Sequence, residues 1–322
     1  MPQSSVYHAV GRLSVIQKNA IDGAKLERLL MAQDAQDARR ILNEYGWPDL
    51  GDNEQNASEH VRQACALIRK LSTDDKMVDA FLVVHDIANL KILLKARSLG
   101  SEGQMLSPCG TIPLEKMRSA VSERDYSAFP LPLKTPLNTL EKRLSMQVNP
   151  MDIDITLDKA HYAWVFSILT DAQKTTKEYF RTKVDIINCA MMLRAMHQEK
   201  TAKFAENLLI TGGFASPKQW LRAFTQPEKL PLLMHRHGTR IYAAAIAAFL
   251  DNEKLPAFEK NADDHLLTFF MPYRRSISDK ERLIGYLLMR ERESAAVRLI
   301  MAGKENHFPE DALRERLREL YG

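Results

Sequence analysis

The sequence predicts an all-α protein, and three observations support this fold class. Glycine is scarce, with 13 in 322 residues, whereas ~7% is usual. Leu, Ala, Lys, Arg, Glu and Met, which favour helices, are abundant. The alternation of β-branched residues that marks strands is nearly absent. Because 45% of the residues are hydrophobic and 27% are charged, the composition is that of an ordinary folded protein with a core.

Helix starts along the chain are marked by capping residues and prolines. We expect two N-terminal helices over residues 7–22 and 24–45, joined near Asp22-Gly23. Later starts are predicted where a capping residue precedes proline, or stands three residues before glutamate. These starts are Asn56 with Glu59, Thr135-Pro136, Asn149-Pro150, Ser216-Pro217 and Ser278 with Glu281.

The helix predicted over residues 81–97, FLVVHDIANLKILLKAR, has one apolar face and one polar face. Its polar face carries Asp86, Asn89 and Arg97. A polar face of this kind is either exposed to water or lines a contact. Its apolar face consists of residues spaced four, three and four positions apart, which is typical of a helix that buries one side. These apolar residues are Val83, Ile87, Leu90 and Leu94.

A short segment of this helix recurs twice. Its acidic residue occurs as Asp86, Asp185 and Glu293, which are 99 and 108 residues apart, and Asn89 matches Asn188. A linker and a new helix start follow each copy. The self-similarity predicts about three helical units of roughly 100 residues each. The three copies are HDIANLKILLKAR (85–97), VDIINCAMMLRAM (184–196) and RESAAVRLIMAGK (292–304).

The repeat gives an expected domain organisation. We expect a first unit over residues 1–130, including the N-terminal helices, a second over 131–230 and a third over 231–322. An alternative that the sequence leaves open is that the N-terminal helices pack with the last unit.

Charge, cysteine content and hydropathy exclude several classes of protein. The formal net charge of +4 is mild, and no basic run with interleaved aromatics predicts nucleic-acid binding. Cys65, Cys109 and Cys189 are far apart, so buried thiols in a reducing compartment are expected. The apolar run over 241–250 is too short to cross a bilayer, which needs roughly 20 residues. With no signal-peptide pattern, we expect a cytoplasmic protein without membrane insertion.

One alternative with chemistry of its own rests on the pair His85-Asp86. This pair resembles the core of the HD-type phosphohydrolases, all-α enzymes that hold a divalent metal through histidine and aspartate. His60 could supply the first ligand, and Asp152 or Asp185 the last. However, the acid recurs in all three copies, whereas the preceding histidine is replaced by valine and by arginine. That pattern favours a role on the helix face, so we expect no metal site.

Other candidate motifs have simple structural explanations. His235-Arg236-His237 would be a poor chelate on a helix, and we interpret it as a solvated turn. Gly212-Gly213 follows a helix and is interpreted as its end rather than as a phosphate-binding loop. The run RERE over 290–293 is either a charged helix face or a binding surface. No grouping of nucleophile and base is present, so no catalytic residue and no cofactor are expected.

Several segments, taken in order, resemble the V-type/A-type ATPase C subunit family, whose eukaryotic counterpart is the d subunit. The resemblance spans nearly the whole chain. Its most specific part is the closing helix, and Tyr7, Ala9 and Arg12 roughly fit the family's opening helix. The segments are DIANLKILLKARSLG, LSPCGTIP, KVDIINCAMMLRA and LLMRERESAAVRLIMAGKENHFPEDAL.

The resemblance implies a fold and a function. The fold would be three all-helical units arranged around a pseudo-threefold axis as a funnel. The protein would be a non-catalytic rotor adaptor on the cytoplasmic face of the membrane. It would join the central-stalk subunits to the proteolipid rotor ring and transmit torque for ATP-coupled proton or sodium transport. An alternative is a helical-repeat scaffold for an unrelated partner.

The recurring polar positions, together with Arg290 of the charged run RERE, are the candidate subunit-interface residues, because three units closed around an axis would turn the recurring positions toward a common centre. The sequence leaves open a second role, in which they only tie helices together inside each unit. The candidates are Asp86, Asn89, Asp185, Asn188, Arg290 and Glu293.

Overall fold

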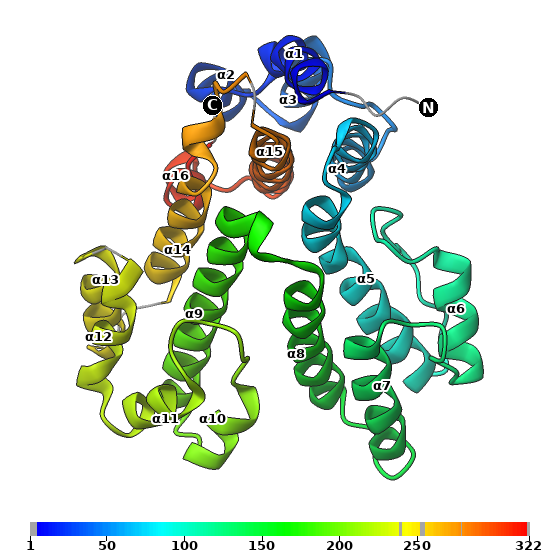
Figure 1. Ribbon diagram of the computed structural model, residues 1–322. Helices are drawn as coiled ribbons and strands as arrows, with labels where there is room; N and C mark the ends of the chain where they lie inside the picture. Colours follow the sequence, from blue (N-terminus) through cyan, green and yellow to red (C-terminus); the bar gives the residue numbers. More distant parts are fainter. Residues whose placement is uncertain (1–4, 238–239, 252–254, 278, 321–322) are drawn as a thin grey trace. The chain divides into compact units, whose positions relative to one another are not determined.

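A computed structural model describes the chain except for residues 1–4, 238–239, 252–254, 278 and 321–322. Throughout the described residues every regular element is a helix (Figure 1), which confirms the predicted all-α class. The arrangement around a pseudo-threefold axis stays a prediction.

The chain forms two compact units. The first unit combines residues 1–78 with 263–322, and the second comprises 79–262, so each boundary falls inside a helix. The first unit therefore places the N-terminal helices together with the last part of the chain. The division into units 1–130, 131–230 and 231–322 stays a prediction.

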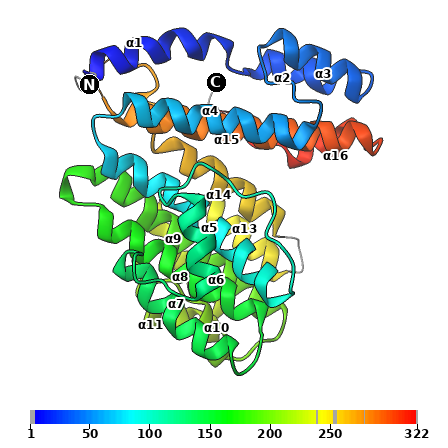
Figure 2. The same ribbon diagram turned by 90° about the vertical axis from the view of Figure 1, so that its right-hand side faces the viewer.

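The first unit is built around two long antiparallel partners, α4 (Asn53–Leu71) and α15 (Glu281–Glu305), which run side by side (Figure 2). Apolar residues from the N-terminal helices, α4, α15 and α16 form its core, with Ile21, Ala38 and Ile300 almost fully buried. The remaining elements of this unit are α1 (Val6–Ile16), η1 (Gln17–Asn19), α2 (Gly23–Leu30), α3 (Ala35–Glu44), η5 (Met271–Tyr273) and α16 (Glu310–Arg316).

The second unit contains most of α5 (Asp75–Ser98) and of α14 (Pro256–Thr268), together with all elements between them. Two ion pairs tie α5 to α8: Lys91 to Asp158 at 2.6 Å and Lys95 to Asp154 at 2.7 Å. The elements in between are α6 (Leu114–Glu123), α7 (Leu131–Leu144), α8 (Pro150–Ile168), η2 (Asp171–Gln173), α9 (Lys174–His197), α10 (Ala202–Leu208), α11 (Pro217–Thr225), η3 (Pro227–Lys229), α12 (Leu230–Met234), η4 (His235–His237) and α13 (Arg240–Leu250).

Two predicted helix starts are confirmed. Asn149 caps α8 by accepting from the amide of Met151, and Ser216 forms a capping box with Gln219 at the start of α11. The predicted stripe on α5 is also confirmed, because Leu90 is fully buried. Ser278 lies outside the described residues.

Other predicted boundaries were wrong, for identifiable reasons. The helix expected over 24–45 is split, because Asp34 accepts from the amide of Asp37 and starts α3. α4 begins after Asp52 rather than Asn56, because the side chain of Asp52 accepts a hydrogen bond from the amide of Gln55. Pro136 lies inside α7, which starts at Leu131 after another proline. A capping residue before proline is therefore ambiguous when several such residues stand close together.

In the part of the chain that the structure describes, we find no helix with the length and apolar character needed to span a membrane. The three cysteines are buried thiols, as the sequence predicted.

Candidate functional site

In the first copy of the repeat, Asp86 holds the segment that starts the next helix. Its carboxylate is fully buried. One oxygen accepts from the amide and the hydroxyl of Thr111, both at 2.7 Å, and the other accepts from the amide of Ile112 at 3.0 Å. These residues directly precede Pro113, the N-cap of α6. Asp86 on α5 therefore fixes where α6 begins.

The second copy repeats this arrangement with different residues. The buried carboxylate of Asp185 on α9 accepts from the amides of Phe214 at 3.0 Å and Ala215 at 3.2 Å. These two residues precede Ser216, the N-cap of α11. Asp185 also lies 3.1 Å from Nε2 of His237. An acid on a long helix again holds the segment just before a short helix, here α11, which follows α10 (Ala202–Leu208).

The asparagines of the repeat hold the same two loops at a second point. Asn89 exchanges two hydrogen bonds with the backbone of Ser107, both at 2.8 Å. Asn188 exchanges two with the backbone of Ile210, at 2.8 and 2.9 Å. An amide side chain suits this task because it donates and accepts at once. Each loop is thus fastened at two points to one helix.

A glycine precedes each anchored segment because the backbone passes directly over the carboxylate. A Cβ added at Gly110 or at Gly213 would lie 2.1 Å from an oxygen of Asp86 or Asp185. The interpretation of Gly213 as part of a helix end missed this role. The signal was present, because in both copies a glycine stands a few residues before the next helix start.

In the third copy the anchored segment comes from the N-terminus of the chain. Glu293 on α15 is buried, and its Oε1 accepts from the amide of Ile21 at 2.7 Å. Ile21 directly precedes Asp22, the N-cap of α2. The α2 start therefore has the same relation to α15 as α6 has to α5. Sequence reasoning missed this connection because 272 residues separate the partners.

The other oxygen of Glu293 belongs to a buried charged cluster. It lies 2.9 Å from Nε2 of His60 and accepts from Arg290 at 2.9 Å. The His60 ring stacks on Trp47 with centroids 3.7 Å apart. Burial lowers the pKa of His60 below 6.5, even though Glu293 raises it, so the neutral ring is favoured.

Basic residues near the ends of two of the three helices hold further backbone. Arg97 donates to the carbonyl of Val121 and, at 2.7 Å, to Glu141. Lys304, at the equivalent position, donates to the carbonyls of Leu30 and Ala32, around the end of α2. The second copy has Met196 there.

The structure buries all six residues predicted as an interface. Asp86, Asp185 and Asn188 have no exposed surface, and Arg290, with 8%, is the most exposed of the set. Their hydrogen bonds end on segments of the same unit, which is the tying role that the sequence left open. Direct contact with another subunit stays a prediction.

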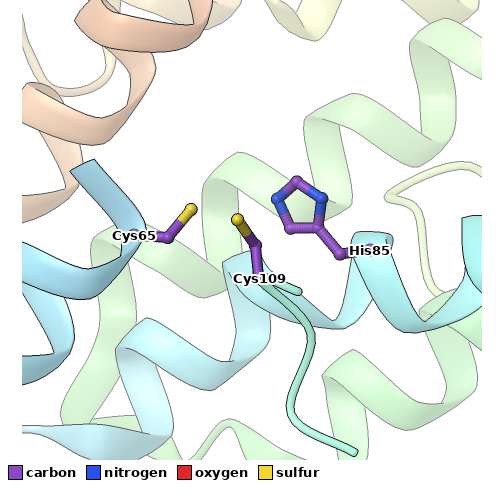
Figure 3. A group of neighbouring side chains, drawn as sticks. All are labelled: Cys65, His85 and Cys109. Carbon is purple, nitrogen blue, oxygen red and sulfur yellow. The ribbon is translucent and has the colours of Figure 1, made fainter. Parts of the chain in front are cut away.

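The residues of the metal alternative have other partners. Both oxygens of Asp86 accept from N–H and O–H donors, which a metal ion would have to displace. His85 places Nδ1 3.0 Å from the hydroxyl of Ser107. Figure 3 shows His85 on α5 and Cys109 on the segment that follows it, with Cys65 of the first unit also labelled. His60 and Asp185 take part in the clusters already described, so the proposed ligand set does not fit.

The turn 235–237 matches its prediction only in part, because His235 and Arg236 are exposed. His237 is buried, at 8% exposure, instead of solvated. Its ring is drawn inward by the hydrogen bond with Asp185. The surrounding glycine and basic residues suggested an exposed turn, and the buried partner is 52 residues away in the sequence.

Comparisons with known proteins identify the class of the chain. A family model described as ATP synthase (C/AC39) subunit matches residues 9–316. The C subunit of the V-type sodium ATPase of Enterococcus hirae is 22% identical over 281 residues, covering 84% of this chain and 83% of the relative. The C subunit of the A-type ATP synthase of Methanocaldococcus jannaschii is 23% identical over 269 residues, covering 76% and 66%.

These matches define a component of a rotary ATPase. The chain belongs to the ATP synthase (C/AC39) subunit family, because the family model spans nearly all of it. The resemblance found in the sequence is thereby confirmed.

Proposed function

We propose that the chain is a non-catalytic rotor adaptor of its ATPase. It joins the central-stalk subunits to the membrane proteolipid ring, on the cytoplasmic face, and transmits torque for ATP-coupled transport of protons or sodium ions. The observation that carries this proposal is the family match over residues 9–316. The names of the two relatives agree with membership of an ion-translocating ATPase.

The buried anchors support a torque-bearing role. A part that transmits force must keep its helices in fixed relation while load passes through it. Asp86 and Asn89 fasten one loop at two points, and Asp185 and Asn188 fasten a second. Buried hydrogen bonds to a charged group are expensive to break. Local loosening under load is therefore disfavoured.

The chemistry of the buried groups supports a non-catalytic role. Asp86, Asp185 and Glu293 accept from donors of their own chain. Such carboxylates are committed to structure, and a general base must instead reach the proton of a substrate.

Co-purification and coupling test the proposal together. We expect a tagged chain to co-purify with the central-stalk and ring subunits from gently solubilised membranes. Lysates of cells lacking the chain should retain ATP hydrolysis by the detached head, whereas vesicles from these cells should lose ATP-driven ion transport. Addition of the purified chain should restore transport. The proposal is wrong if neither set of subunits co-purifies from cells that express both. That result would favour the helical-repeat scaffold.

A further inference from the structure

Two arginines pack against the ring of Phe214 in the second unit. The Cζ atom of Arg181 lies 4.0 Å from the ring centroid, and that of Arg236 lies 4.1 Å from it. The three residues come from α9, from the segment before α11, and from η4 after α12, elements that lie together in Figure 1. We call these three residues the Arg-Phe-Arg stack.

The stack is held in place by the buried anchor beneath it. The amide of Phe214 donates to Asp185 at 3.0 Å, and Arg181 donates to the carbonyl of Gly213 at 3.3 Å. Arg236 is followed by His237, whose ring is bound to Asp185. Each member of the stack is therefore fixed directly, or through its neighbour, by the same network. A preorganised site loses less freedom when a partner binds.

Among the residues that the structure describes, the positive charge of the stack has no ion-pair partner. Arg236 and Phe214 retain exposed surface, as does Arg181. Within the described ranges, no carboxylate forms an ion pair with either guanidinium, and the oxygens of Asp185 are engaged by backbone amides and His237. A guanidinium stacked on an aromatic ring keeps its N–H groups in the plane, where a carboxylate can accept two of them.

The other two copies of the repeat lack this feature. The position four residues before the acid is Arg181 in the second copy but Leu82 and Met289 in the first and third, both buried. The first residue held by the acid is Thr111 or Ile21 in those copies. The stack is therefore specific to the second copy and is not part of the arrangement that the three copies share.

We propose that the Arg-Phe-Arg stack is a docking site for an acidic segment of another subunit of the same ATPase. This inference rests on the proposed function. Charge complementarity selects the occupant: one or more Asp or Glu side chains bind the two guanidiniums, and the exposed part of Phe214 contacts the adjoining apolar atoms. Such contacts determine specificity and association rate. Because only the second of the three copies carries the stack, a partner that binds there takes one defined orientation relative to this chain.

Reconstitution with neutralised arginines tests the site. The probe is a preparation of membranes from cells lacking this chain but carrying the other subunits. Purified chains with both Arg181→Gln and Arg236→Gln are compared with wild type and with Arg143→Gln, an exposed arginine on α7. We expect the double variant to bind about tenfold more weakly at low salt, with a flatter dependence on salt, and Arg143→Gln to match wild type.

The outcomes separate this inference from the proposed function. Unchanged binding and salt dependence of the double variant, with normal binding of wild type, overturns the docking site and leaves the adaptor role intact. Failure of wild type itself to bind overturns the adaptor role. If phosphatidylserine vesicles alone capture wild type and not the double variant, the stack binds lipid and the proposal is wrong. Thermal melting checks that each variant is folded.

A chemical crosslink identifies the occupant. In the intact complex, Arg236→Lys supplies an amine that a carbodiimide joins to a carboxylate in contact with it. We expect an amide bond to an Asp or Glu of another subunit, located by mass spectrometry, that does not form when the coupling is carried out in high salt. No link to another subunit, or links only to carboxylates of this chain, would contradict the proposal.

Discussion

The anchors on α9 and on α15 occupy equivalent positions but hold parts of the chain with different origins. Asp185 holds Phe214, 29 residues later, whereas Glu293 holds Ile21, 272 residues earlier. In both cases the anchored amide lies just before the N-cap of a short helix. The repeat thus preserves a spatial relation and not an order along the chain, and the N-terminal segment completes the last copy.

The comparison also shows how the acid adapts to its neighbours. Aspartate suffices where the loop passes directly over the helix with a glycine, as at Gly213. Glutamate, with one more methylene, spans the distance to Ile21 and to His60 in the third copy. The longer side chain reaches partners from two separate segments of the first unit.

The largest effect is expected on removal of an anchor. Asp185→Ala leaves the partly buried amides of Phe214 and Ala215, and the buried ring of His237, without their acceptor. The free energy of unfolding, measured with urea, should fall by about 3–5 kcal/mol. Glu293→Ala should lower it by a similar amount.

Hydrogen exchange distinguishes the two anchors. Asp185→Ala should raise exchange at residues 210–216, and Glu293→Ala should raise it at residues 20–30. If Glu293→Ala instead loosened only residues 306–316, after α15, the N-terminal segment would not complete the third copy.

The next largest effect is expected at the glycines. Gly213→Ala places a methyl group on the Asp185 carboxylate and should destabilise by about 2–3 kcal/mol. Gly11→Ala is the matched control, because nothing lies within 4 Å of its added Cβ on α1. This control should stabilise by up to about 1 kcal/mol. If Gly213→Ala and Gly11→Ala changed the free energy of urea unfolding equally, the close approach of Gly213 to Asp185 would be contradicted.

A smaller effect is expected near the helix ends. Arg97→Met imposes the residue that the second copy has at Met196 and removes the contacts to Glu141 and Val121. We expect a loss of about 1–2 kcal/mol in unfolding free energy, because Glu141 keeps its bond from Tyr126. Met196→Leu replaces one apolar side chain with another of similar volume and should lower the unfolding free energy by less. If Arg97→Met left the unfolding free energy unchanged, the contacts of Arg97 would contribute nothing to stability.

Two buried histidines should make the stability of the chain depend on pH. Burial lowers the pKa of His161 from 6.5 to about 3, and burial also lowers that of His60. Just below pH 6.5 the unfolded chain therefore binds protons at these two histidines, whereas the folded chain does not. Stability is complete above about pH 6.5 and falls below it, by at most about 1.4 kcal/mol per unit for each histidine. His161→Gln should flatten the slope in urea unfolding between pH 6.5 and 5, and an unchanged slope would contradict the assignment.

Much of the fold was predictable from local patterns. The apolar stripe on α5 and the caps at Asn149 and Ser216 use contacts within a few residues, which the sequence displays directly. The recurrence of Asp86, Asp185 and Glu293 identified the right positions. The glycines at 110 and 213 signalled two of the anchored segments, but the residues whose amides are bound were not predictable, because a carboxylate that binds backbone amides places no constraint on their side chains.

The long-range features were the ones that sequence reasoning missed. The link from Glu293 to Ile21 joins the N-terminal and C-terminal parts of the chain, and the buried ring of His237 is bonded to Asp185, 52 residues away. The Arg-Phe-Arg stack joins three elements that are separated in sequence. Such features depend on packing between elements, which helical periodicity alone does not determine.

Observation of rotation tests the adaptor role most directly. The catalytic head of the purified complex is fixed to a surface, and a gold nanorod is attached to an exposed loop of this chain. If the chain is a rotor adaptor, the nanorod rotates when ATP is added and stops when ATP is removed. A nanorod that stays still on this chain, while one attached to the central stalk of the same preparation rotates, would contradict that role.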